Sequence, residues 1–168
     1  MEKINTQPSP KNFSRVLALL GESPAKLEAL SRSLTEEQLC EPLSDNEWSF
    51  KQHLAHLLSR DEITSQSICY ALLVDDPILP DIHTQRHWAS LVRYERFPVS
   101  ELFSSYNFRR ATLLRVLAEL TDAEWENTVS RVSKRPETIY RLARLLALHE
   151  VDHLDDIAGK LKTRTPNL

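Results

Sequence analysis

Two histidines near the end of the chain, His149 and His153, are four residues apart, a spacing at which two imidazoles can share one metal ion. Residues at this spacing lie about 40° apart around an α-helix and about one turn apart along it. Both belong to an apolar stripe that also contains Leu142, Leu145, Leu146 and Ile157. A buried imidazole without a partner costs free energy, so this pair needs one. A divalent metal ion would satisfy both rings.

A third ligand is expected from another helix, because metal sites that keep a position open for a reactant commonly have three protein ligands. The segment 48–74 offers two candidates, His53 and His56, which are followed by Asp61 and Glu62. Spacing alone does not choose between these two histidines. Zinc and nickel are the expected metals, since both bind neutral imidazole readily.

The run His149-Glu150-Val151-Asp152-His153 also matches H-E-x-x-H, in which the Glu is the general base of a metallopeptidase. No further His or Glu follows His153, so the downstream ligand of such enzymes is missing and we do not expect this chemistry. Glu150 and Asp152 are expected on the solvent face of the helix. The alternative is that they accept hydrogen bonds from ligand histidines.

Four long amphipathic segments must position these residues, and none alternates as a strand would. They span about 11–34, 48–74, 100–120 and 136–161. The first is either one helix kinked at Pro24 or two pieces that meet there. The sequence therefore predicts an all-α four-helix bundle, with a long crossover between the second and third helices.

One domain is expected from the length of 168 residues. We expect a flexible leader at 1–10, the helical bundle at 11–162 and a tail at 163–168. Cys40 and Cys69 form neither a CxxC pair nor a disulfide framework, and both are expected to be buried thiols.

The charge of the chain gives no reason to expect nucleic acid or a membrane surface as a partner, since the formal net charge is −3 and the pI is near 6.1. No apolar run approaches the ~18 residues of a membrane span. The first residues lack the apolar core of a signal peptide. We therefore expect a cytoplasmic protein.

The sequence resembles the DinB-like (DinB/YfiT-like) superfamily of four-helix bundles from roughly Phe13 to Gly159. The resemblance rests on four stretches of sequence and on the H-x-x-x-H of His149 and His153. The stretches are Glu47-Trp48-Ser49-Phe50, Ala55-His56-Leu57, Arg109 to Leu114 and Thr121 to Trp125.

This resemblance implies a metal site and a class of reaction. In the family, the His eight residues after the Trp is a ligand, which selects His56, and the other two ligands map onto His149 and His153. Members commonly hold a divalent metal in this way, and some transfer low-molecular-weight thiols such as bacillithiol or mycothiol to electrophiles. The implied protein is a metal-dependent thiol transferase or hydrolase that acts on a small-molecule substrate and pairs as a homodimer.

Several alternatives stay open. His53 lies nearer the apolar stripe of its helix than His56 and is the alternative ligand. His53, Arg109 and Asp152 are candidates to bind the substrate or to support a ligand. Asp156 departs from the Gln usual in the family, which leaves the substrate undetermined. A bundle that binds metal or a small ligand without turnover, in stress protection, is the alternative function.

Overall fold

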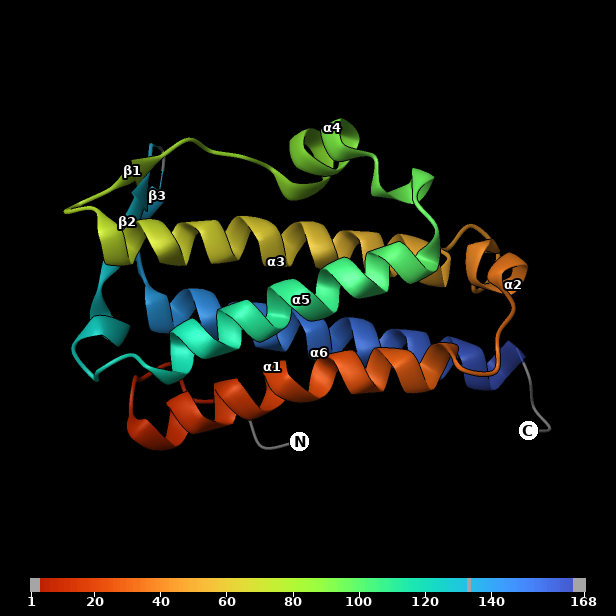
Figure 1. The fold of residues 1–168 in the computed structure, drawn as a ribbon, viewed down its shortest axis with the longest axis horizontal. Helices are drawn as coiled ribbons and strands as arrows, with labels where there is room; N and C mark the ends of the chain where they lie inside the picture. The colour runs from red at the N-terminus through yellow and green to blue at the C-terminus, as the bar shows by residue number, and fades with distance from the viewer. Residues whose placement is uncertain (1–3, 133, 165–168) are drawn as a thin grey trace.

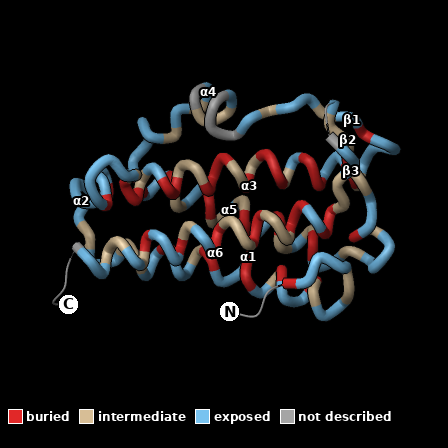
Figure 2. The backbone as a smooth tube through the Cα atoms, turned by 180° about the vertical axis from the view of Figure 1, so that it is seen from behind, coloured by how far each residue is buried: buried red, intermediate tan, exposed pale blue. Residues whose placement is uncertain are grey.

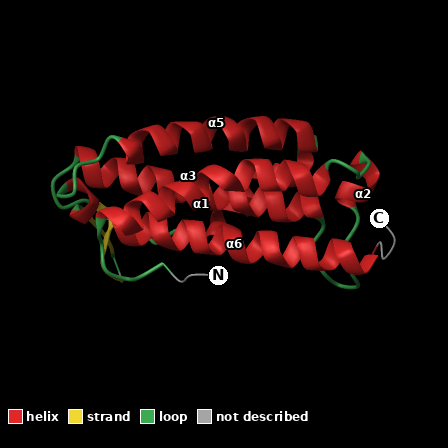
Figure 3. Ribbon diagram, turned by 90° about the horizontal axis from the view of Figure 1, so that it is seen from below, coloured by secondary structure: helices red, strands yellow, loops and turns green. Residues whose placement is uncertain are grey.

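The computed structural model, which describes residues 4–132 and 134–164, confirms the predicted four-helix bundle (Figure 1). Helix α1 packs against α5 and α6, and α3 packs against the same two helices. Figure 3 shows the long helices side by side, with the strands gathered at one end. The long helices are α1 (Pro10–Ser31), α3 (Phe50–Leu73), α5 (Val99–Ala118) and α6 (Ile139–Arg164).

The predicted crossover connects α3 to α5 and returns along α3, so these two helices run in the same direction (Figure 1). It contains strand β1 (Ile78–Leu79), a π-helical turn (Thr84–Ala89), the short helix α4 (Ser90–Val92) and a 3-10 turn (Tyr94–Arg96). The π-helical turn contacts α3. One side of α3 is therefore covered by the crossover.

A small three-stranded sheet is added to the predicted helical bundle, so the fold is mostly helical. Strand β2 (Thr128–Arg131) pairs parallel with β1 and antiparallel with β3 (Lys134–Thr138). We predicted that the last helix begins near Pro136, but this residue lies in the edge strand β3, where a missing N–H is tolerated. Strands this short show too little alternation to be recognised.

Side-chain caps fix the starts of the two histidine-bearing helices. At α3, the Ser49 hydroxyl accepts from the Gln52 N–H while the Gln52 side chain accepts from the Ser49 N–H. This capping box satisfies two backbone donors at once. At α6, the Thr138 hydroxyl accepts from the Arg141 N–H.

The buried side chains form two apolar clusters, one toward the sheet and one toward the short helix α2 (Glu36–Cys40). Figure 2 shows the buried positions concentrated on the four long helices, while the crossover and α2 are mostly exposed. The sheet-side cluster includes Leu20, Ile68, Leu117, Tyr140 and Leu146. The α2-side cluster includes Leu27, Phe50, Leu54, Tyr106 and Leu154.

Helix α1 continues through Pro24 as one helix, which settles the choice left open by the sequence. Proline has no N–H, so the carbonyl of Leu20, four residues earlier, loses its helical hydrogen bond. Ahead of α1, Ile4 is buried and its carbonyl accepts from Arg144 Nε.

Both cysteines lie at the surface, so the prediction of buried thiols is wrong. Cys40 ends α2, and Cys69 lies near the end of α3. Among the described helices, none combines the length and the apolar character needed to cross a bilayer.

Candidate metal centre

Three histidines from two helices converge between α3 and α6. His56 of α3 and His149 and His153 of α6 each offer a ring nitrogen, and these nitrogens all lie within 4.8 Å of one another. Two of them, His56 Nε2 and His149 Nε2, are 3.1 Å apart. All three side chains are partly buried.

This spacing suits ligands of a single ion. Zinc–nitrogen bonds are about 2.0–2.1 Å, so two nitrogens on one tetrahedral ion lie roughly 3.3 Å apart. The separation of 3.1 Å between the His56 and His149 Nε2 atoms is close to this value. The three histidines therefore fit a divalent metal with little rearrangement.

His53, the alternative ligand, lies beside this group and is not one of its three members. Its side chain is nearly inaccessible, and its Nδ1 is 2.9 Å from His153 Nδ1. Its other nitrogen, Nε2, is 3.7 Å from Asp156 Oδ2. His53 thus contacts the metal centre through His153.

All four histidines favour the neutral form. Burial is the main cause, and in His53, His56 and His149 the next largest is a neighbouring histidine of the cluster. Together they lower the pKa of His56 to about 3 and the pKa values of His53 and His149 to about 4. Burial also lowers the pKa of His153. Neutral rings keep the lone pairs that a metal requires.

A cavity of about 210 Å³ lies directly against His56. The indole of Trp48 meets the His56 ring edge-on at 5.1 Å and stacks on the His153 ring at 6.1 Å, so it closes one side of the centre. Trp48 also lines the cavity, so it joins the histidines to it. The lining comprises Trp48, Gln52, Ala55, His56, Ser59, Ala89, Tyr94 and Glu95.

Glu62 of α3 holds the crossover over the cavity. Its carboxylate accepts from Trp88 Nε1 at 2.8 Å and from the Tyr94 hydroxyl at 2.6 Å. Arg109 Nη1 lies 3.3 Å from the same carboxylate. The candidate substrate residue Arg109 is therefore paired with Glu62, and it does not line the cavity beside His56.

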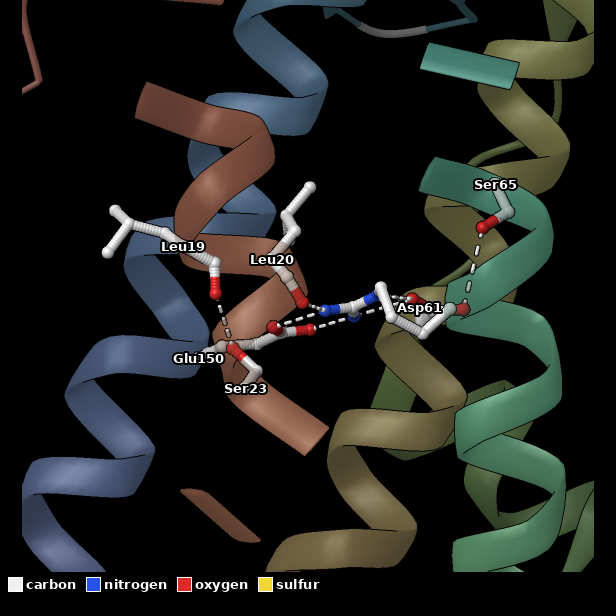
Figure 4. Close-up of polar contacts among 7 residues, drawn as sticks. Leu19, Leu20, Ser23, Asp61, Ser65 and Glu150 are labelled. Carbon is white, nitrogen blue, oxygen red and sulfur yellow. Dashed lines mark hydrogen bonds and ion pairs between the residues drawn. The ribbon is translucent and has the colours of Figure 1, made fainter. Parts of the chain in front are cut away.

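A buried ionic cluster includes Glu150, the residue that follows His149 in the chain. The guanidinium of Arg110, on α5, donates to Asp61 of α3 and to Glu150 of α6, and all three side chains are at most 1% exposed. Burial alone would lower the pKa of Arg110, but the Glu150 carboxylate raises it well above its usual value. Burial raises the pKa of Asp61. Figure 4 shows Asp61 and Glu150 facing each other across the bundle.

The position of Glu150 corrects the expectation that it lies on the solvent face. It is fully buried and points to Arg110, which also removes it as a general base for the metal centre. Asp152 is exposed, as expected. The burial of Arg110 was missed, although a signal was present: it continues the apolar stripe of Leu102, Tyr106, Leu113 and Leu117.

Known structures share this fold. YfiT from Bacillus subtilis, described as a probable metal-dependent hydrolase with an unusual four-helix bundle topology, superposes with a TM-score of 0.84 at 20% identity, over 98% of this chain and 94% of that one. The four-helix bundle protein TT2238 gives 0.62 at 19% identity, over 88% and 98% of the two chains.

The mycothiol-dependent maleylpyruvate isomerase gives a TM-score of 0.71 at 12% identity and covers 94% of this chain but 63% of its own. At these identities the likeness shows the fold alone. A search of curated proteins finds no match. The family model of the DinB superfamily matches residues 19–157, a span that includes all three converging histidines. The chain belongs to the DinB superfamily.

Proposed function

We propose that this chain is a metal-dependent enzyme in which His56, His149 and His153 hold one divalent ion and a small electrophilic substrate binds beside it. One observation carries the proposal. Three partly buried imidazoles bring ring nitrogens within 4.8 Å of one another, and a cavity of about 210 Å³ lies against one of them. Zinc and nickel are the proposed metals, because the donors are neutral imidazoles.

Three protein ligands leave room for a reactant. An ion held this way, when bound, lowers the pKa of a water or thiol beside it and polarises an electrophile. The protein supplies the surroundings: Trp48 shields one side of the centre from water. Gln52, Tyr94 and Glu95 give the cavity polar groups that can orient a substrate.

Two reaction types are proposed: transfer of a low-molecular-weight thiol to the electrophile, and hydrolysis of the electrophile. YfiT is described as a probable metal-dependent hydrolase, and the isomerase of similar fold depends on mycothiol. These descriptions concern those proteins and support both reaction types here without choosing between them.

The test begins with elemental analysis of protein purified without a histidine tag. Wild type is expected to hold about one equivalent of metal, and His149→Ala is expected to lose it, because two imidazoles remain of three. A screen of thiols with electrophiles, and of hydrolysable esters and amides, then identifies the reaction. Full retention of metal by His149→Ala would contradict the proposed ligand set.

A specific observation favours a second function, in which the bundle is a structural or ligand-binding protein, metal-free or binding metal without turnover, and the histidines are a polar feature of its core. One ring nitrogen of each of the four histidines also pairs with another histidine, at 2.9 Å for His53 with His153 and 3.1 Å for His56 with His149, so these nitrogens have partners without a metal. Stoichiometric metal without activity in both screens favours this alternative.

Homodimer formation is a further proposal, which light scattering of the purified protein tests.

A further inference from the structure

His53 contacts the proposed metal centre through one of its ligands, His153. It is 3% exposed and approaches His153 on the Nδ1 side, with 2.9 Å between the two Nδ1 atoms. Its Nε2 makes no hydrogen bond within the described residues, and Asp156 Oδ2 is 3.7 Å away. Asp156 itself is held by Lys160, whose Nζ lies 2.8 Å from the same oxygen.

The short distance between the two Nδ1 atoms requires one proton between them. If His153 donates it, the Nε2 of His153 keeps a lone pair, and His53 carries its own proton on Nε2, toward Asp156. If His53 donates it, the neutral His153 carries its proton on Nε2 and cannot bind a metal through that atom. Only the first arrangement is compatible with a metal on His153 Nε2.

We propose that His53 is a positioning residue that fixes His153 in the Nδ1–H form and so strengthens metal binding, with Asp156 orienting His53 in turn. This role rests on the proposed function, because it needs the three-histidine metal site. Ligand histidines generally donate their second N–H to an acceptor, and loss of that acceptor typically weakens metal binding about 10- to 100-fold. Here the acceptor is another histidine instead of a carboxylate or a backbone carbonyl.

The geometry separates this role from that of a fourth ligand. The nitrogens of His56, His149 and His153 lie within 4.8 Å of one another, and His53 is not part of that group. Its Nδ1 pairs with His153 Nδ1 at 2.9 Å, and its Nε2 lies 3.7 Å from Asp156 Oδ2.

Two substitutions of His53 test the role by competition for zinc against a chromophoric chelator. His53→Leu removes the acceptor and fills the buried space, and is expected to weaken zinc binding about 10- to 100-fold. His53→Asn can place a side-chain oxygen near the position of Nδ1, and is expected to restore most of the affinity. Equal affinity of His53→Leu and wild type overturns the role, as does equal loss in both variants.

A measurement on the wild type does not depend on how the variants fold. In ¹⁵N–¹H spectra of the zinc-loaded protein, His153 is expected to carry its proton on Nδ1 and zinc on Nε2, while His53 carries its proton on Nε2. A zinc-shifted nitrogen in His53 would make it a ligand and overturn the role. Absence of zinc binding by wild type is a different result, because it refutes the proposed function together with this role.

Discussion

Pro24 and Arg110 are linked through one backbone carbonyl. Pro24 cannot donate to the carbonyl of Leu20, and Arg110 Nη1 donates to that oxygen at 2.9 Å instead. The same guanidinium binds the carboxylates of Asp61 and Glu150. Because these acceptors come from α1, α3 and α6, a single side chain of α5 joins all four long helices.

Replacing Arg110 by Met is expected to lower the free energy of unfolding by about 3–5 kcal/mol, because two buried carboxylates and a carbonyl lose their partner. Urea denaturation at pH 7 measures this. Arg109→Met is the matched control, since Arg109 is 32% exposed and pairs with the partly buried Glu62. Its loss should cost about 1 kcal/mol or less. Similar losses in the two variants would contradict the structural role of Arg110.

The link to Pro24 gives a second stability prediction. In Pro24→Ala the new N–H can bond to the Leu20 carbonyl, so that oxygen no longer depends on Arg110. The loss caused by Arg110→Met should then be smaller by about 1 kcal/mol than in the Pro24 background. A double-mutant cycle in urea measures the difference, and strictly additive effects would show that the carbonyl contributes nothing to the pairing.

The sequence predicted the bundle and the histidine pair of α6 because both depend on local spacing. His149 and His153 share one face of α6 whatever the helix packs against, and the apolar stripes identify the buried faces. The choice between His53 and His56 came only from family resemblance, because both occupy the first turns of α3 and both approach α6. Which nitrogen meets which partner depends on tertiary packing.

Charged residues inside apolar stripes were harder to interpret. Glu150 was expected in solvent because isolated carboxylates are rarely buried. Its partner, Arg110, is 40 residues away in the chain. The neighbouring residue is also an arginine, but the side chain of Arg109 is 32% exposed, whereas that of Arg110 is buried. Only the position of Arg110 in the stripe of its helix distinguished the two. The sheet was missed because its strands are short.

The lowered histidine pKa values predict that acid destabilises the metal-free protein. An unfolded histidine titrates near pH 6.5, whereas the pKa of His56 in the fold is about 3 and those of His53 and His149 are about 4. Between these limits the unfolded chain binds more protons, so the free energy of unfolding falls as pH falls.

From pH 7 to pH 5, the decrease should be about 2 kcal/mol or more in total. Urea denaturation at each pH, in the presence of a chelator, measures it. His56→Leu should show a shallower decrease, because one of the buried neutral rings is gone. The same slope in both proteins would mean that His56 does not contribute to this pH dependence.

Metal binding should stabilise the fold. An ion that binds only the folded state adds about 2.7 kcal/mol at a free concentration 100-fold above its dissociation constant. Zinc should therefore raise the melting temperature of wild type, a chelator should reverse the shift, and His149→Ala should show little response. A zinc shift as large in His149→Ala would indicate binding elsewhere, for example at the exposed His83 and His87.

Glu62 should limit how often the crossover opens over the cavity, and its replacement should leave the helical bundle intact. Its carboxylate accepts from Trp88 and Tyr94, and both hydrogen bonds weaken when the charge is removed. In Glu62→Gln, trypsin cleavage after Arg93 and Arg96 should become several-fold faster, because the crossover opens more often.

The controls for Glu62→Gln separate local from global opening. Zinc affinity should stay at the wild-type value, since Glu62 contacts none of the converging histidines in the described structure. Glu119→Gln, at the exposed end of α5, removes the same charge away from the crossover and should leave cleavage unchanged. Cleavage at the wild-type rate in Glu62→Gln would show that other contacts hold the crossover against α3.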